Sequence, residues 1–169
     1  MIKEFEFDRR KVLKSLLFFT ILLLLSVWFV FEPKRFIMNV FMKEYHVLII
    51  GYSCGLVSAL KFISILLIIN RKIAIVVTGE YLIDNSSYES LGKIYWSAVK
   101  RIQVKPSGNL KIVVEKNELK LEKKTLFQKL LLHIQNLDYK NSVVISSTLL
   151  KCSFEELEES ILTAFKNNR

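Results

Sequence analysis

Two long apolar runs dominate the first half of the chain. Residues 15–31 carry no charged side chain, and residues 45–70 carry only Lys61. Leu13 extends the first run, and the Lys14 side chain can reach back to the headgroups. At roughly 1.5 Å per residue, about 17–20 helical residues cross a hydrocarbon core of about 30 Å, so both runs can span it. We therefore predict two transmembrane helices, at about 13–31 and about 46–70, which form a helical hairpin within residues 13–72.

The first run also invites comparison with a secretory signal peptide. The apolar core of a signal peptide is shorter, and it ends at a cleavage site of small residues. Here the run ends instead in aromatic residues, Trp28, Phe29 and Phe31, with the charged Glu32 directly after them. We favour an uncleaved membrane anchor.

The second run contains two features with functional alternatives. Gly51 and Gly55 have the GxxxG spacing that lets two helix backbones approach closely. Their natural partner is the first helix of the same chain, and a second copy in a homodimer is the alternative. Lys61 has a long stem that can carry its charge to the headgroups. Because neither run contains an acidic partner, we favour a lipid-interface role for Lys61, Arg71 and Lys72 over a charge in a transport path.

Positive charge is concentrated around the apolar runs. Residues 1–72 contain 11 Lys/Arg and 5 Asp/Glu, a net charge of +6 out of +9 for the whole chain. This distribution is typical of cationic flanks at a membrane surface, so we expect a lipid bilayer and no nucleic acid as partner. The positive-inside rule places both ends of the chain in the cytoplasm, with residues 1–12 as a basic tail.

The pattern changes after residue 72. Short β-branched runs with a period of two predict strands, and runs with a period of about 3.6 predict helices. Ser153 and Glu156 have the spacing of a helix-capping box. We predict an α+β domain over residues 73–169, PH-like, with a curved antiparallel sheet capped by a C-terminal helix; other α+β folds fit the same order. Its predicted strands are 73–78, 81–83, 93–96, 99–104, 110–115, 118–121 and 143–147, and its helices are 123–136 and the segment after Ser153.

No recognisable catalytic constellation accompanies this domain. The two cysteines, Cys54 and Cys152, have no metal-ligand or redox spacing, and neither His46 nor His133 belongs to a recognisable arrangement with a nucleophile. We expect no enzyme, no catalytic residue, no metal and no cofactor. The candidate partner surface comprises Asp84, Asn85, Trp96, Lys100 and Arg101. For Trp96 we favour core packing over a ligand platform, and for the 84–87 turn a structural Asx-type turn over an anion site.

Three groups of residues resemble a known family. They are Gly79 with the Leu82–Ser87 turn, the Gly92–Trp96 segment followed by Val99 and Ile102, and Ile145-Ser-Ser followed by Ser153-Phe-Glu-Glu-Leu. With them the chain is similar to an uncharacterised family of small bacterial membrane proteins that have two transmembrane helices and a PH-like domain. The resemblance implies a multi-pass protein of the bacterial plasma (inner) membrane, and it brings no catalytic residue.

These observations predict a membrane-anchored, non-enzymatic binding or adaptor module at the cytoplasmic face of the membrane, with a protein partner. Two other functions are compatible with the same sequence. One is an immunity protein (antitoxin) of a bacterial toxin system. The other is a component of a small oligomeric channel or transporter, for which Lys61 and the glycine pair are the motivation.

Overall fold

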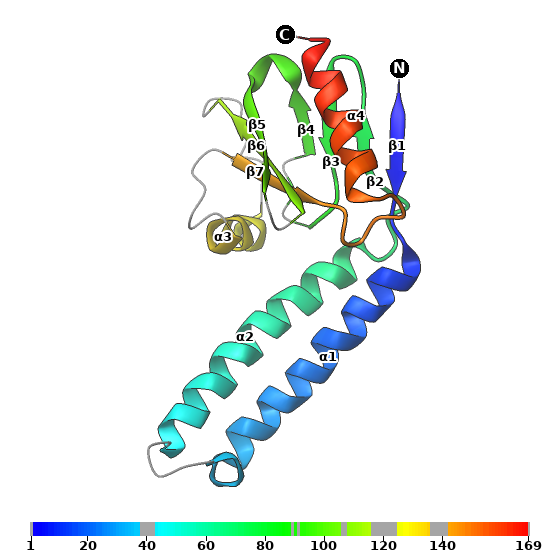
Figure 1. Ribbon diagram of the computed structural model, residues 1–169. Coiled ribbons are helices and arrows are strands. Elements are labelled where there is room, and N and C mark those ends of the chain that lie inside the picture. Colours follow the sequence, from blue (N-terminus) through cyan, green and yellow to red (C-terminus); the bar gives the residue numbers. More distant parts are fainter. Residues whose placement is uncertain are drawn as a thin grey trace. The chain divides into compact units, whose positions relative to one another are not determined.

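Figure 1 shows the computed structural model of the chain, which describes residues 2–37, 43–88, 90, 92–105, 108–115, 125–135 and 142–168. The chain forms two compact units. One contains residues 12–67, and the other joins residues 1–11 to residues 68–169. The strand predicted at 118–121 lies outside the described residues.

The first unit is a hairpin of helix α1, Arg9–Phe31, and helix α2, Glu44–Ile68, with the short 3₁₀ helix η1, Pro33–Phe36, after α1. The two long helices have 23 and 25 residues, which makes each at least about 34 Å long. Most of their large apolar side chains are exposed, Leu24 and Leu56 among them, whereas the core helix of a soluble protein buries such side chains. Both helices are therefore long enough and apolar enough to cross a membrane.

Helix α1 begins four residues earlier than the apolar run predicts. The carboxylate of Asp8 accepts hydrogen bonds from the backbone N–H groups of Arg10, at 2.9 Å, and Lys11, at 3.3 Å. Aspartate in this position satisfies N–H groups that have no partner within the helix. The cap explains why a charged segment, Arg9–Lys11, is already helical.

The N-terminal residues form a strand where we predicted a basic tail. Strand β1, Lys3–Glu6, pairs antiparallel with strand β2, Ile73–Val77, with Phe5 opposite Ile75. Phe5 is only 3% exposed, and Phe7 is also buried. The reason is a period of two: in Lys-Glu-Phe-Glu-Phe the apolar residues alternate with charged ones and so point to one face. The first 11 residues belong to the folded domain.

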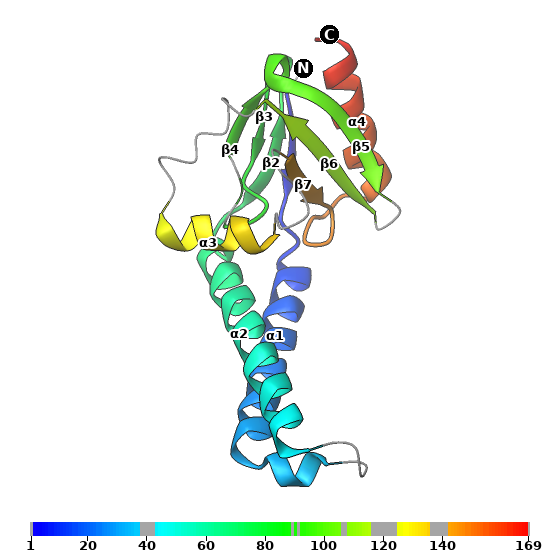
Figure 2. The ribbon, with the colours of Figure 1, turned by 90° about the vertical axis from the view of Figure 1, so that its left-hand side faces the viewer.

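Seven strands form two antiparallel sheets within the described part of this domain. The first has the order β1-β2-β3-β4, and the second has the order β5-β6-β7. Strands β5 and β6 run obliquely to β2 and β3 (Figure 2), and a 3₁₀ turn, η2, Trp96–Ala98, leads from one sheet to the other. The remaining strands are β3, Tyr81–Asp84, β4, Gly92–Tyr95, β5, Val99–Lys105, β6, Asn109–Val114, and β7, Ser142–Ser146.

Helix α4, Phe154–Lys166, completes the core of the domain. Leu157 and Ile161, one turn apart on α4, are fully buried, as are Leu82 of β3 and Ile112 of β6. The capping hydrogen bond predicted at Ser153 is present, because its Oγ accepts from the N–H of Glu156 at 3.2 Å. The predicted layout of two apolar helices, antiparallel sheets and a C-terminal helix is thus confirmed. The other helix of this domain is α3, Leu126–Gln135.

Candidate functional site

The glycine pair lies inside the hairpin. A Cβ atom on Gly51 would lie 3.0 Å from Val30 Cγ2 and 3.1 Å from Phe29 Cβ, and one on Gly55 would lie 3.1 Å from Ser26 Oγ. These distances are shorter than most Cβ contacts, so a side chain at either position would push the neighbouring atoms of α1 away, and the glycines allow α1 and α2 to pack closely. The small-residue face of α2 therefore packs against α1 of the same chain, which is the first of the two partners that the sequence suggested.

The basic residues near the end of α2 lie in different settings. Lys61 is half-buried, seven residues before the last residue of α2, Ile68. Arg71 belongs to the sheet domain, and its Nη1 donates to the backbone carbonyls of Asn85, at 3.4 Å, and Ser87, at 3.5 Å. The guanidinium therefore holds the loop after β3.

Lys72 belongs to a small ion-pair cluster around Glu6. The Glu6 carboxylate lies 2.6 Å from Lys151 Nζ and 3.4 Å from Lys72 Nζ. The hydrogen bond from Lys151, followed by that from Lys72, lowers the pKa of Glu6 below its ordinary value of 4.5. The cluster links the N-terminal strand to the start of β2 and to the segment before α4, and it sits at an exposed position where salt screens it.

Two residues of the candidate partner surface are buried. Asp84 is 1% exposed, and its Oδ1 accepts from Ser86 N at 2.9 Å and Ser86 Oγ at 2.6 Å. These bonds make the 84–87 segment an Asx-type turn. Trp96 is 3% exposed, its Nε1 donates to Thr78 O at 2.8 Å, and its ring lies 6.3 Å from that of Phe165. Neither side chain offers area to a partner.

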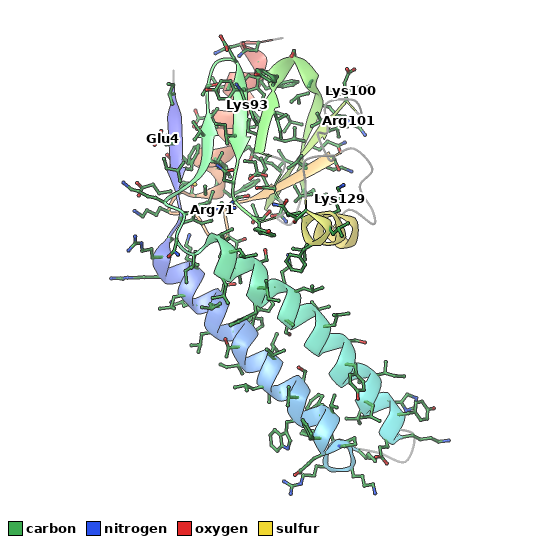
Figure 3. The ribbon with its side chains drawn as sticks, turned by 180° about the vertical axis from the view of Figure 1, so that it is seen from behind. Glu4, Arg71, Lys93, Lys100, Arg101 and Lys129 are labelled. Atoms are coloured by element: carbon green, nitrogen blue, oxygen red, sulfur yellow. The ribbon has the colours of Figure 1, made fainter. Side chains whose placement is uncertain are left out.

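The other members of that set are accessible to different degrees. Asn85 is half-buried, and its N–H donates to the carbonyl of Ala74 at 2.7 Å. Lys100 and Arg101 are exposed on β5, at the outer margin of the domain (Figure 3). Lys100 Nζ lies 3.4 Å from Glu115 Oε1. The five residues therefore do not form one surface, and only the pair on β5 remains open to a partner.

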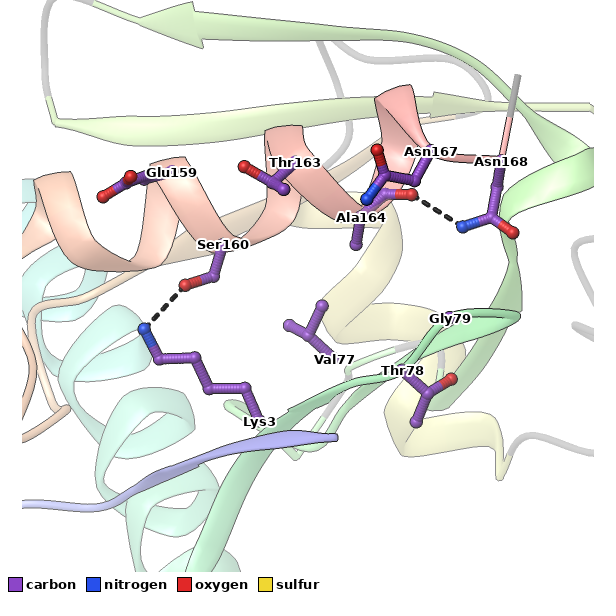
Figure 4. Close-up of a pocket in the computed structure, with 10 residues that line it drawn as sticks. All are labelled: Lys3, Val77, Thr78, Gly79, Glu159, Ser160, Thr163, Ala164, Asn167 and Asn168. Carbon is purple, nitrogen blue, oxygen red and sulfur yellow. Dashed lines mark hydrogen bonds between the residues drawn. The ribbon is translucent and has the colours of Figure 1, made fainter. Parts of the chain in front are cut away.

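Sequence reasoning missed a pocket of about 310 Å³ between the β1–β2 ribbon and α4 (Figure 4). Lys3 and Ser160 meet at its mouth, where Lys3 Nζ donates to Ser160 Oγ at 2.9 Å and pairs with Glu156 at 3.1 Å. The two residues are 157 positions apart, so no local pattern could join them. Its lining is formed by Lys3, Val77, Thr78, Gly79, Glu159, Ser160, Thr163, Ala164, Asn167 and Asn168.

An exposed aromatic cluster on β3 and β4 was also missed. Lys93 Nζ lies 3.8 Å from the ring centre of Tyr81 and 4.6 Å from that of Tyr95, and these two tyrosines face each other across the strands. A hydrogen bond with Tyr95 raises the pKa of Lys93. Alternation along two paired strands was the available signal, since Tyr81 and Tyr95 are each adjacent to a buried apolar residue, Leu82 and Ile94, that points to the opposite face.

Within the described ranges, no three His, Cys, Asp or Glu side chains come together in a way that could hold a metal ion. The pocket between β1 and α4 is lined by apolar, amide and hydroxyl side chains together with Lys3 and Glu159, and the Ser160 hydroxyl accepts from Lys3 Nζ and donates to the backbone carbonyl of Glu156 at 2.7 Å. Compared with known proteins, the chain matches no family model, no curated protein and no solved structure.

Proposed function

We propose that this protein is a membrane-anchored, non-enzymatic binding module, in which a PH-like domain at the cytoplasmic face of the membrane docks an extended segment of a protein partner. The observation that carries the proposal is the place of the helical hairpin in the chain. It is inserted between β1 and β2, two paired strands of one sheet. The domain is therefore tethered by two short connections instead of one.

This insertion argues for a permanent anchor. Cleavage after α1, as in a signal peptide, would remove β1 from the sheet and expose the core around Phe5. The exposed apolar side chains along both helices require a cover of matching chemistry, which a bilayer supplies. Seven Lys/Arg side chains lie close to the two domain-side ends of the hairpin and three lie in its loop, which favours a cytoplasmic domain.

Strand β5 is the best-suited docking edge. It is the longest of the described strands, at seven residues, and it ends its sheet in the order β5-β6-β7. Such an edge can accept an added strand, because β6 is the one strand that pairs with β5 among the residues that the structure describes. Val104 is 47% exposed, and Arg101 is exposed in the same strand. An apolar residue and a positive charge along the edge fit an extended segment that carries an acidic side chain.

Anchoring and docking are tested separately. Alkaline carbonate should leave the full-length protein in the membrane pellet, and its release into the soluble fraction would contradict the anchor.

For docking, a photoreactive benzoylphenylalanine at Val104 should form one defined protein adduct in native membranes. The same group at Glu155, exposed at the start of α4, should not form it. Arg101→Glu should abolish the adduct, and Lys166→Glu, an equal charge change on α4, should preserve it. Equal adducts from Val104 and Glu155, or none from Val104, would refute docking at β5.

A further inference from the structure

The first turn of helix α3 is unusually well fixed for a helix that connects two strands. Thr125 Oγ1 accepts from Gln128 N at 3.2 Å, and Gln128 Oε1 accepts from Thr125 N at 3.0 Å, a reciprocal capping box. The amide nitrogen of the same Gln128 side chain donates to the carbonyl of Tyr88 at 3.1 Å. The ring of Phe127 lies 5.9 Å from that of Tyr88. This turn is thus attached to the loop after β3.

The same loop is attached to the exit of α2. Arg71, which binds the carbonyls of Asn85 and Ser87, follows the last residue of α2, Ile68, by three positions. Three residues span at most about 10 Å, so the loop is held close to the point where the chain leaves the helix. Arg71 and Lys129 of α3 lie at the same end of the domain (Figure 3). The start of α3 is therefore close to the end of a helix that crosses the membrane under the proposed function.

The surface of this turn has the composition of an interfacial helix. Leu126 is 86% exposed, although it is a large apolar side chain, and Lys129, nearly one turn later, is exposed as well. Leu131 is buried and holds the helix to the domain. The sequence adds Lys123 and Lys124 just before the cap. An exposed apolar residue among cations on a short helix is the pattern of segments that lie in the headgroup region.

We infer that the first turn of α3 rests on the cytoplasmic leaflet, with Leu126 at the boundary of the acyl chains and Lys129 and Arg71 against anionic headgroups. The headgroup layer is about 5–8 Å thick on each side of the bilayer, so a helical turn that lies within this layer brings an exposed leucine side chain to its boundary with the acyl chains. A soluble partner would have to cover Leu126 beside the membrane. This inference rests on the proposed function, under which the bilayer already lies beside Leu126. The bilayer can therefore cover this side chain without a second protein. Contact with lipid at α3 would fix which way the β5 edge points.

The inference is tested with purified full-length protein in vesicles that contain no other protein. The background carries Cys54→Ser and Cys152→Ser, and one cysteine is placed at Leu126, at Leu24 in the hairpin, or at Lys166 at the end of α4. Each is labelled with the environment-sensitive dye NBD. The quencher is a phospholipid with a doxyl group near the headgroup end of its acyl chain, in vesicles of phosphatidylcholine with or without phosphatidylglycerol.

We expect quenching at Leu126 and Leu24 and none at Lys166, with quenching at Leu126 at least twofold weaker when phosphatidylglycerol is omitted. Lys129→Glu should produce the same weakening in the anionic vesicles. If Leu24 is quenched and Leu126 is as unquenched as Lys166, the anchor stands and the lipid contact of α3 is refuted. If Leu24 is not quenched, the hairpin is not in the bilayer and both proposals fail. Equal quenching at Leu126 with and without phosphatidylglycerol refutes the headgroup contacts of the cations.

Discussion

Replacing Phe5 with alanine tests whether the N-terminal segment is part of the domain. The side chain is 3% exposed and lies on β1, which pairs with β2 across the inserted hairpin. Truncation of a buried phenylalanine costs about 3–5 kcal/mol, from the loss of apolar burial and from the cavity that remains. Because β1 is at the edge of its sheet, it can relax into part of the cavity, and we expect the lower end, about 3 kcal/mol. That is a large fraction of the roughly 5–15 kcal/mol by which a domain is stable.

The assay follows from the two tryptophans of the chain. Trp28 is exposed on α1 and Trp96 is buried in the domain, so Trp28→Phe leaves a fluorophore that reports unfolding of the sheets alone. Urea titrations of the full chain in detergent micelles should then show a lower midpoint for Phe5→Ala. With a slope of about 1.5 kcal/mol per molar urea, the midpoint should fall by about 2 M.

The matched control is Phe31→Ala, the same truncation at an exposed position at the end of α1. A change at such a position is expected to stay within about 0.5 kcal/mol. If Phe5→Ala proves too unstable to purify, Phe5→Leu gives a smaller cavity and a measurable shift in the same direction. Equal midpoints for Phe5→Ala and the parent would show that residues 2–7 are a tail and that the pairing of β1 with β2 is wrong.

Three further changes test other parts of the structure. Gly51→Leu should separate α1 from α2 and lower the midpoint of thermal unfolding that circular dichroism of the helices reports in detergent. Ser53→Leu, on the exposed face of α2, should leave this midpoint unchanged. Equal effects of the two substitutions would contradict the packing of α1 against α2. The folded-state pKa of Glu6 is lowered, so its contribution is complete above its ordinary value of 4.5 and is lost as the pH falls through the folded value. Glu6→Gln should accordingly lower the free energy of unfolding at pH 7, and below pH 4.5 the variant should lose less of its stability than the parent does. Parallel profiles of stability against pH for the variant and the parent would contradict this. Burial, followed by the charge of Glu156, raises the pKa of Cys152. Its thiol should therefore react with a maleimide at pH 7.5 more slowly than free cysteine does, and equal rates would contradict the raised pKa.

The sequence predicted the large elements of the fold because their signals are long or repeated. The helices of the hairpin follow from two runs that carry almost no charge, and β6 follows from a β-branched run that a turn precedes and Lys116-Asn117 closes. Helix α4 was predicted from the spacing of a capping box, of which the hydrogen bond to the Ser153 hydroxyl is present. Thr125 and Gln128 have the same capping-box spacing in the sequence. This spacing predicts that α3 begins at Leu126, where it does begin, and not at residue 123.

What the sequence did not reveal depends on pairing between distant segments. β1 has only four residues, and its charges suited a basic membrane flank equally well. Its partner strand follows about 70 positions later, after both helices of the hairpin. The pocket between Lys3 and Ser160 exists only once that pairing is made. Asp84 and Trp96 were candidates for a partner surface, although an Asx-type turn was favoured for residues 84–87 and core packing for Trp96. Both side chains are buried and bind backbone groups, as those favoured interpretations predict.

The insertion of the hairpin between β1 and β2 also constrains how the protein can work. The chain enters α1 directly after a segment held from two sides: Phe7 N donates to Lys72 O at 3.1 Å, and Asp8 N donates to Leu149 O at 2.8 Å. Lys151 N donates back to Glu6 O at 3.1 Å. The segment that precedes α1 is thus bonded both to the start of β2 and to the residues that lead into α4. A force on α1 therefore acts on backbone hydrogen bonds of the folded domain, and the anchor cannot be removed without opening the core. A binding module built in this way stays at the membrane for as long as it is folded, so under the proposed function it regulates its partner by capture at the membrane and not by recruitment from solution.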